Sequence, residues 1–317
     1  MKTARRKFFP IPFLIPALAA CAGPVSRMPR EVVAKIPLID VHAHYPGRPP
    51  RTAQDFIRTM DSVGIEQTVL FLGGTGGRET SDLQKYSDRF VLFFAGPAAN
   101  DAVRAKIKTG DPKAIEELLD DYERALQSSL YRGLGEIYAY HSDRPTQLAP
   151  DSPAIRGLLE LVTRYRVPIS IHCTADGRPE MERALKSHPK ASVIWTHTGS
   201  FLSPAVMTDL LETHPNLYFE LAIKNKRLRI DRYPILSGMT LREDWRQLFE
   251  SYPERFFLGF DFPGTGPNHG TPLETAAESA EFFRTILMQL NPSTARKIAY
   301  QNARAILAKR RASSSAL

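Results

Sequence analysis

The chain has 317 residues, of which 43% are hydrophobic, and this is enough to bury the core of one large α/β barrel or of two ordinary domains. The formal net charge of +8 raises the question of nucleic-acid binding, but four basic residues lie within the first seven positions, and without them the charge is +4. A charge of that size does not indicate a nucleic-acid partner, and we expect none. With only two cysteines, Cys21 and Cys173, the chain has no disulfide framework.

The first twenty residues have the features of an export signal. A basic start is followed by an apolar stretch, Phe8 to Ala20, which is interrupted by prolines and is shorter than the ~20 residues of a membrane span. The stretch ends in Leu18-Ala19-Ala20-Cys21, which resembles the lipobox of bacterial lipoproteins. This resemblance implies removal of residues 1–20 and lipidation of Cys21. The alternative is an apolar segment that ends in a cysteine by chance.

These features predict a protein that is exported to the periplasmic side of a bacterial membrane and anchored there by a lipid on Cys21. Ala22, which follows the cysteine, resembles the outer-membrane case. Arg5 and Arg6 resemble the start of a twin-arginine signal, although the usual leucine after the phenylalanine is missing. Both Sec and twin-arginine export therefore stay open.

After a linker, residues 21–35, strand-like runs alternate with amphipathic helical segments, which is the pattern of a parallel sheet covered by helices. We predict strands at residues 36–44, 67–72, 90–95, 133–137, 167–173, 192–198, 217–222 and 256–262. Helices are predicted between them at residues 53–60, 112–130, 154–165, 181–187, 206–213 and 245–252. Eight such strands match a single-domain (β/α)8 barrel, a TIM barrel, over residues 36–309, with an open doubly wound sheet as the alternative. Residues 310–317 are predicted to be a disordered tail.

Histidine and carboxylate side chains occur at or near the ends of five predicted strands. His42 and His44 end the first strand, where residues two apart point to the same face. The others are Glu136 on the fourth strand, His172 on the fifth, His197 on the sixth and Asp261 on the eighth. Strand ends of a barrel meet at one face and build its active site, and unpaired polar groups inside apolar strands are costly. The six residues therefore indicate one shared site that suits a divalent metal.

In chain order, these segments resemble the metal-dependent hydrolases of the amidohydrolase superfamily, and most closely its amidohydrolase-related branch. The similarity lies in residues 39–44, 135–137, 169–173, 193–199, 258–263 and 302–307. It implies a divalent metal, most often zinc, bound by His42, His44, His172 and Asp261, with His197 near it.

The resemblance also implies how the site would work. The metal would lower the pKa of a bound water to about 7, and Asp261 would accept the water's proton and pass it to the leaving group. His197 would polarise the substrate carbonyl or hold a second metal. Glu136 decides between one metal and two: it either bridges the two ions, as in TatD-like members, or accepts a hydrogen bond from a ligating histidine. Glu220 on the seventh strand has the same two interpretations.

Further residues are candidates for substrate contact. Tyr138, with His141 close to it, follows the fourth strand, and His269 lies in a glycine-rich segment after the eighth. Lys224 and Arg227 belong to a basic cluster after the seventh strand. Such a cluster would attract a carboxylate or phosphate group of a substrate, and the alternative is a solvated loop.

We therefore expect a metal-dependent hydrolase that uses a metal-activated water to cleave an amide, ester or lactone bond in a small molecule, and an anionic substrate fits the basic cluster. A metal-dependent decarboxylase or a phosphoester hydrolase would use the same ligands and is the alternative within the family. A noncatalytic periplasmic binding lipoprotein is the alternative from another class, but such a protein needs no proton acceptor such as Asp261. The sequence leaves open whether the chain forms a homo-oligomer.

Overall fold

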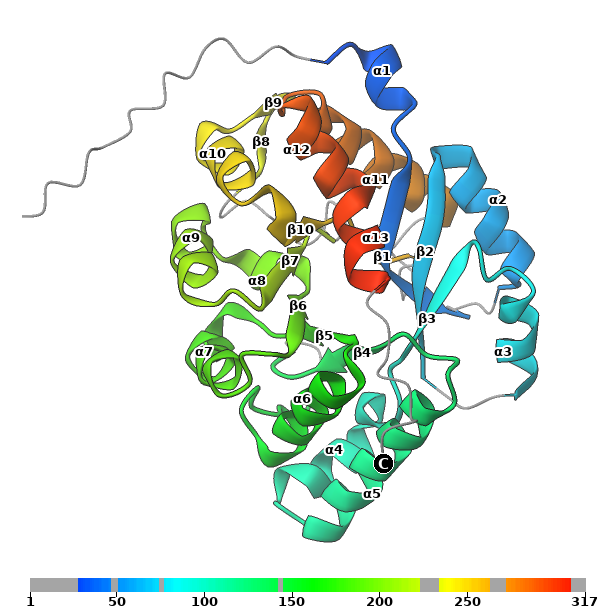
Figure 1. Ribbon diagram of the computed structural model, residues 1–317, viewed down its shortest axis with the longest axis vertical. Coiled ribbons are helices and arrows are strands. Elements are labelled where there is room, and N and C mark those ends of the chain that lie inside the picture. The colour runs from blue at the N-terminus through cyan, green and yellow to red at the C-terminus, as the bar shows by residue number, and fades with distance from the viewer. Residues whose placement is uncertain are drawn as a thin grey trace, which may run out of the picture.

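Eight parallel strands follow one another around the fold, with helices on the outside (Figure 1). The computed structural model describes residues 28–46, 51–73, 77–141, 145–222, 234–262 and 272–308. The strands, in the order in which they pair, are β1 (Leu38–Tyr45), β2 (Ile65–Leu72), β3 (Phe90–Phe94), β4 (Gly133–Tyr138), β5 (Pro168–His172), β6 (Ser192–Trp195), β7 (Leu217–Glu220) and β10 (Phe256–Phe257).

The first and last strands meet and nearly close the sheet. Val41 N donates to Leu258 O at 2.9 Å, and His44 N donates to Phe262 O at 3.0 Å. Parallel bridges join the same two segments of the chain. The structure therefore confirms the predicted single-domain TIM barrel. The alternative of an open doubly wound sheet is wrong, because its edge strands would not contact each other.

Helices cover the outside of the barrel and close one of its ends. They are α1 (Arg30–Ala34), α2 (Ala53–Val63), α3 (Gly77–Gln84), α4 (Asp101–Lys108), α5 (Pro112–Gln127), α6 (Pro153–Tyr165), α7 (Arg178–Ser187), α8 (His197–Phe201), α9 (Pro204–Thr213), α10 (Glu243–Ser251), α11 (Pro272–Leu287), α12 (Pro292–Arg296) and α13 (Asn302–Leu307). A short turn, η1 (Pro97–Ala99), precedes α4, and β8 (Leu236–Ser237) pairs with β9 (Thr240–Leu241) in a separate hairpin. All six predicted helices are present, whereas α1, α3, α4, α8, α11, α12 and α13 were not predicted.

The limits of α2 follow from its local sequence. Thr52 and Asp55 form a capping box, in which Asp55 Oδ2 accepts from Thr52 N at 2.8 Å and Thr52 Oγ1 accepts from Asp55 N at 3.2 Å. The helix ends at Gly64, whose φ of 77° is in the left-handed region. Phe56 and Met60, four residues apart, share one face of the helix and are buried in the core.

An apolar cluster fills the interior of the barrel. The strands contribute Ile39, Val41, Val69, Phe71, Phe93, Ile194 and Phe257, and α13 contributes Ala303 and Ile306. Asn302, the first residue of α13, donates to Pro253 O at 2.8 Å and to Phe256 O at 2.9 Å. These bonds tie α13 to the start of β10, so that the helix closes this end of the barrel.

Residues 28–35, which belong to the predicted linker, pack against the barrel. Val33 in α1 is buried, and Arg284 Nη1 donates to its carbonyl oxygen. Met28 N donates to Met288 O at 3.0 Å. The burial of two apolar side chains explains why this segment is ordered with the barrel. The predicted signal peptide, the predicted lipidation site Cys21 and the predicted tail 310–317 lie outside the described residues.

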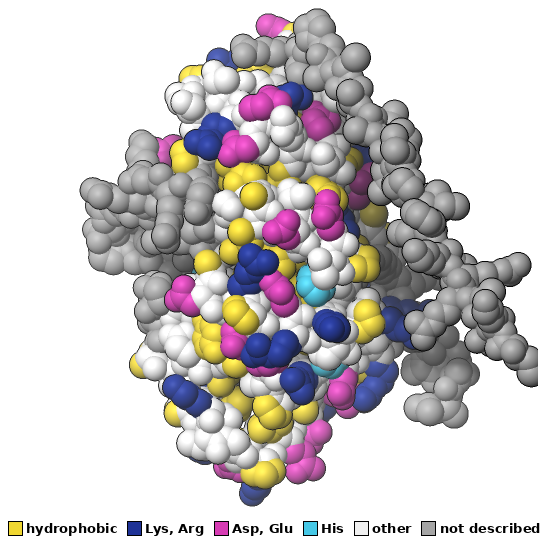
Figure 2. Space-filling model, turned by 90° about the vertical axis from the view of Figure 1, so that its left-hand side faces the viewer, with side chains coloured by type: hydrophobic (Ala, Val, Ile, Leu, Met, Phe, Trp, Pro, Cys, Tyr) yellow, Lys and Arg dark blue, Asp and Glu magenta, His cyan; other side chains and the backbone are white. Residues whose placement is uncertain are grey.

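None of the described helices is long and apolar enough to cross a membrane. On the side of the molecule that carries α7, α9 and α10, basic and acidic side chains are interspersed over the described surface (Figure 2).

Candidate metal centre

Hydrogen bonds across the barrel closure bring residues of β1 next to the segment that follows β10. Asp40 Oδ1 accepts from His42 N at 2.8 Å and from Phe260 N at 2.9 Å. Asp261 N donates to His42 O at 2.7 Å. These bonds place His42 and Asp261 side by side. The role of Asp40 was not predicted, although its alternation with His42 along the strand is a signal for it.

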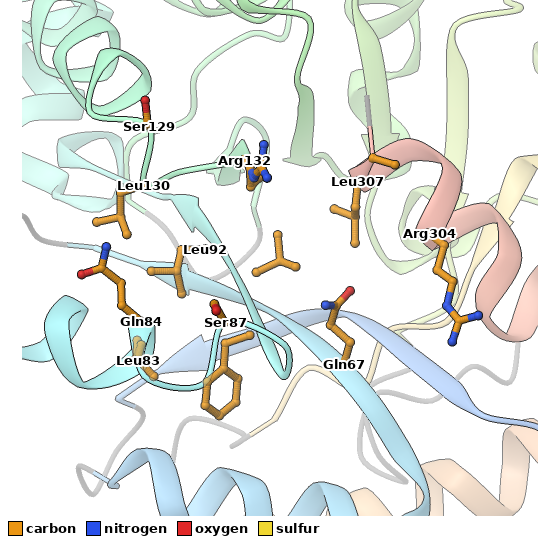
Figure 3. A pocket seen from close by; sticks show the side chains of 13 residues that line it. Gln67, Leu83, Gln84, Ser87, Leu92, Ser129, Leu130, Arg132, Arg304 and Leu307 are labelled. Carbon is orange, nitrogen blue, oxygen red and sulfur yellow. The ribbon is translucent and has the colours of Figure 1, made fainter. Parts of the chain in front are cut away.

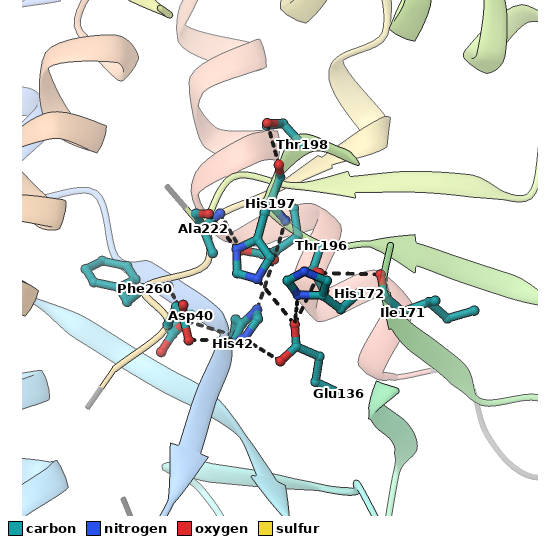
Figure 4. A network of polar contacts seen from close by, with 12 residues as sticks. Asp40, His42, Glu136, Ile171, His172, Thr196, His197, Thr198, Ala222 and Phe260 are labelled. Atoms are coloured by element: carbon teal, nitrogen blue, oxygen red, sulfur yellow. Dashed lines mark hydrogen bonds and ion pairs between the residues drawn. The ribbon is translucent and has the colours of Figure 1, made fainter. Parts of the chain in front are cut away.

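Four side-chain atoms form a compact group at this closure, and two of them belong to His42 and Glu136, which are labelled in Figure 4. His42 Nε2 and His44 Nε2 are 3.2 Å apart. Glu136 Oε2 lies 3.6 Å from the first of these nitrogens and 3.4 Å from the second. Asp261 Oδ1 lies 3.4 Å and 3.3 Å from them. A tetrahedral ion with bonds of about 2.0–2.1 Å holds its ligand atoms about 3.3 Å apart. The spacing and the donor atoms therefore fit a divalent metal such as zinc.

The other oxygen of Glu136 faces a second group. His172 Nδ1 lies 2.9 Å from Glu136 Oε1, and His197 Nε2 lies 3.2 Å from it. Thr196 Oγ1 donates to the same oxygen at 3.3 Å. The two carboxylate oxygens thus face two different pairs of histidines. This geometry fits a carboxylate that bridges two ions.

Hydrogen bonds behind the histidines set which ring nitrogen faces the site. His42 Nδ1 pairs with Glu220 Oε2 at 3.0 Å, and His197 Nδ1 pairs with Ala222 O at 2.8 Å. A carboxylate and a backbone carbonyl are acceptors, so Nδ1 carries the proton and the lone pair on Nε2 of a neutral ring points into the site. Of its two interpretations, Glu220 fits the role of a hydrogen-bond acceptor behind His42.

Two of the predicted ligands lie beyond the ends of their strands. β6 ends at Trp195 and β10 at Phe257, earlier than predicted, because the backbone turns at the site. His197 and Asp261 have φ values of 54° and 49°, in the left-handed region. For residues other than glycine such conformations cost of order 1–3 kcal/mol and are concentrated at functional sites.

Comparison with known proteins identifies the family of this chain. A model of the amidohydrolase family matches residues 39–309. The chain belongs to the amidohydrolase family. No curated protein matches the sequence.

Solved structures share the fold of this amidohydrolase at low sequence identity. An uncharacterised TIM-barrel protein from Bordetella bronchiseptica is 17% identical, covers 86% of this chain and 98% of its own, and has a TM-score of 0.60. A probable 2-pyrone-4,6-dicarboxylic acid hydrolase from Acinetobacter baumannii with citric acid bound is 16% identical (85% and 98% covered, TM-score 0.55). An amidohydrolase from Burkholderia multivorans with bound zinc is 13% identical (86% and 99% covered, TM-score 0.50).

Opposite charges stabilise one another in the metal-free cluster of this amidohydrolase. Burial acts to raise the pKa of Glu136, but the histidines around it hold this pKa well below its ordinary value. Burial acts to lower the pKa of His42, but the carboxylates of Glu136, Glu220 and Asp261 raise it well above its ordinary value. Without an ion, the cluster therefore favours a charged His42 beside a charged Glu136. A metal must displace protons from such a site in order to bind.

All six predicted ligands lie in this cluster, whereas the structure describes only some of the residues that were predicted to contact the substrate. Tyr138 ends β4, with its ring centroid 5.9 Å from that of His172. Lys224, Arg227 and His269 lie outside the described residues, so their roles stay predictions. The neighbouring Cys173 is buried, and burial raises its pKa to about 12, which does not suit a nucleophile.

A hollow of about 520 Å³ lies at the other end of the barrel (Figure 3). It is lined by the end of α3, by β2 and β3, by Ser129, Leu130 and Arg132, and by α13. The strand ends that carry the histidines are on the opposite side, so this hollow is separate from the metal centre.

Proposed function

We infer that this amidohydrolase is a metal-dependent hydrolase that cleaves an amide, ester or lactone bond in a small molecule. The proposal rests on the spacing of 3.2–3.6 Å that separates the Nε2 atoms of His42 and His44 from each other and from one oxygen each of Glu136 and Asp261. A divalent ion bound there would lower the pKa of a water to about 7. Asp261, beside both imidazole nitrogens, would accept the proton of that water and deliver it to the leaving group.

Two ions fit the site better than one, because each oxygen of Glu136 faces its own pair of histidines. His197 would then hold the second ion. Metal analysis of the full chain should give close to two ions per chain, and Glu136→Gln should reduce this to about one or fewer, since an amide nitrogen is not a ligand. The exposed Glu160→Gln on α6 is the control. One ion in the wild type would make Glu136 a hydrogen-bond acceptor instead.

A lactone that carries carboxylates is the first substrate class to test. The name of the similar structure from Acinetobacter baumannii describes a hydrolase of such a compound. The basic cluster of Lys224 and Arg227 would suit the same chemistry. Lys224→Ala or Arg227→Ala should raise KM for an anionic substrate about tenfold, the loss of one charge-assisted hydrogen bond. Unchanged kinetics in both variants would contradict a role in substrate binding.

An assay panel separates the proposed hydrolase from its alternatives. The full chain, loaded with zinc, is tested on lactones, esters, amides, phosphoesters and carboxylic acids. Hydrolysis should disappear on chelation, return with zinc, and fall at least about 100-fold in Asp261→Asn, which loses the proton acceptor. Release of carbon dioxide would indicate a decarboxylase. Metal binding without turnover would favour a binding lipoprotein, and a chain that binds no metal would overturn the proposal.

Export and a lipid anchor on Cys21 complete the proposed role. They place the hydrolase on the periplasmic side of a bacterial membrane, with a small-molecule substrate. Full-length protein should sediment with membranes when expressed in a bacterium, and Cys21→Ser should release it. Equal sedimentation of both would argue against the anchor.

A further inference from the structure

A fully buried arginine from α4 holds the end of β4. Arg104 Nε donates to Thr146 O at 3.1 Å, and Nη2 donates to Thr146 O at 2.5 Å and to Ala139 O at 3.1 Å. Nη1 donates to Tyr138 O and, at 3.4 Å, to Ala98 O. The guanidinium thus joins η1, the end of β4 and the segment around Thr146 through four backbone carbonyls.

The neighbouring glutamine holds the next residue of the site. Gln147 Oε1 accepts from His141 N, and Gln147 Nε2 donates to His141 O, both at 2.6 Å. The His141 ring lies over the His172 ring, with centroids 4.1 Å apart and planes inclined by 33°. Nδ1 of His172 lies 2.9 Å from Glu136 Oε1. A continuous set of contacts therefore leads from Arg104 to a predicted metal ligand.

We propose that Arg104 and Gln147 are positioning residues for the metal centre. They hold the His141 ring over His172, and the stacked ring keeps His172 turned with Nδ1 toward Glu136. Neither residue is a ligand, and the inference rests on the metal-dependent function proposed above. It adds two residues that act on the ligand His172 from outside the cluster.

The chemistry of both side chains supports this role. A buried charge is costly, and an apolar side chain of similar size is often as stable in its place. The planar guanidinium can donate in several fixed directions at once, whereas a lysine ammonium is a point charge with three donors. Side chains that orient metal ligands from behind are typically worth ten- to a hundredfold in metal affinity.

The test uses the full chain labelled with ¹³C at histidine Cε1. The His172 signal is assigned by its absence in His172→Asn. Gln147→Met and Arg104→Lys should change the chemical shift of this signal in the metal-free protein. The reason is that the His141 ring moves away from His172, so that its ring current acts less on the His172 signal. The same variants should weaken Co²⁺ binding, followed by visible absorption, about ten- to a hundredfold. Gln247→Met on α10 and Arg164→Lys on α6, both exposed, should leave both measurements unchanged.

Each outcome bears on one proposal. A wild-type His172 signal and wild-type Co²⁺ affinity in both test variants would show that the positioning role is wrong. A wild-type chain that binds no Co²⁺ would defeat the proposed function, and the His172 signal would then decide the positioning role alone. If Arg104→Lys does not fold, the Gln147→Met variant decides. Its unfolding midpoint shows that the chain is folded when its His172 signal is measured.

Discussion

At the scale of single residues, Gly259 leaves room for the Glu220 carboxylate that orients the His42 ring. A Cβ atom at this position would lie 1.8 Å from Glu220 Oε1. Glu220 Oε2 pairs with His42 Nδ1, and Glu220 Oε1 accepts from Ala222 N. The Glu220 carboxylate therefore occupies the space that a side chain at position 259 would need.

Gly259→Ala should push Glu220 away from His42. We expect Co²⁺ affinity to fall about ten- to a hundredfold, and the free energy of unfolding to fall by about 1–3 kcal/mol because the site becomes overpacked. Gly73→Ala is the matched control, since a Cβ there meets nothing within 4 Å. Equal Co²⁺ affinity in the two variants would show that Glu220 does not orient the ligand.

The raised pKa of His42 predicts how the stability of the metal-free protein depends on pH. Its contribution is fully present below the ordinary imidazole pKa of about 6.5 and is lost as the pH rises through the higher folded-state value. The lowered pKa of Glu136 adds stability above the ordinary carboxyl value, and this is lost only as the pH falls through the lower folded-state value. Both contributions are therefore present near pH 6.

Metal binding has the opposite dependence, because an ion needs neutral imidazoles. The unfolding midpoint should therefore be measured at pH 8, 7 and 6, with zinc and with a chelator. We expect the gap between the two midpoints to shrink as the pH falls. A gap that is constant or widens toward pH 6 would contradict the assignment of His42 as a ligand.

At the scale of elements, α13 contributes stability at the end of the barrel remote from the chemistry. Its first residue, Asn302, is buried and satisfies the carbonyl oxygens of Pro253 and Phe256. Ala303 and Ile306 fill the barrel interior behind it. The segment 302–307, which is part of the resemblance to the family, therefore has a structural role in this barrel.

Asn302→Ala should remove the side-chain donor to the buried carbonyl oxygen of Phe256 and to the partly buried one of Pro253. We expect the free energy of unfolding to fall by about 1–3 kcal/mol in chemical denaturation, with metal content unchanged. Gln301→Ala, at an exposed neighbouring position, should have little effect on stability. Loss of metal in Asn302→Ala at a temperature where the chain stays folded would mean that the two ends of the barrel are coupled.

At the scale of the whole molecule, the barrel separates stability from chemistry. The apolar cluster extends from α13, at the end where the strands begin, through the interior to Phe71, whose ring centroid lies 4.8 Å from that of His42. The histidines and carboxylates lie where the strands end. This arrangement allows histidines and carboxylates to lie together at one end of the barrel without interrupting the apolar core. It also explains why polar residues near strand ends were a useful signal in the sequence.

Local patterns in the sequence predicted only those features that depend on residues close together in the chain. The alternation of His42 and His44 predicted that both side chains share a face, and the apolar runs predicted the strands. The left-handed turn of His197, Thr198 and Gly199 that begins α8 was not predicted, because its first two residues are not glycines. Arg104 and Gln147 were not singled out, because their partners are backbone carbonyls and amides that carry no sequence signal.

The order of the strands and the six candidate ligands could be predicted from the residues, because burial in a strand restricts residue types along the chain. Which atoms face each other became visible only in the folded barrel. Barrel closure brings Asp40 to Phe260, and it directs one oxygen of Glu136 to His44 and the other to His172. Such pairings depend on the register and twist of strands that are distant in the sequence.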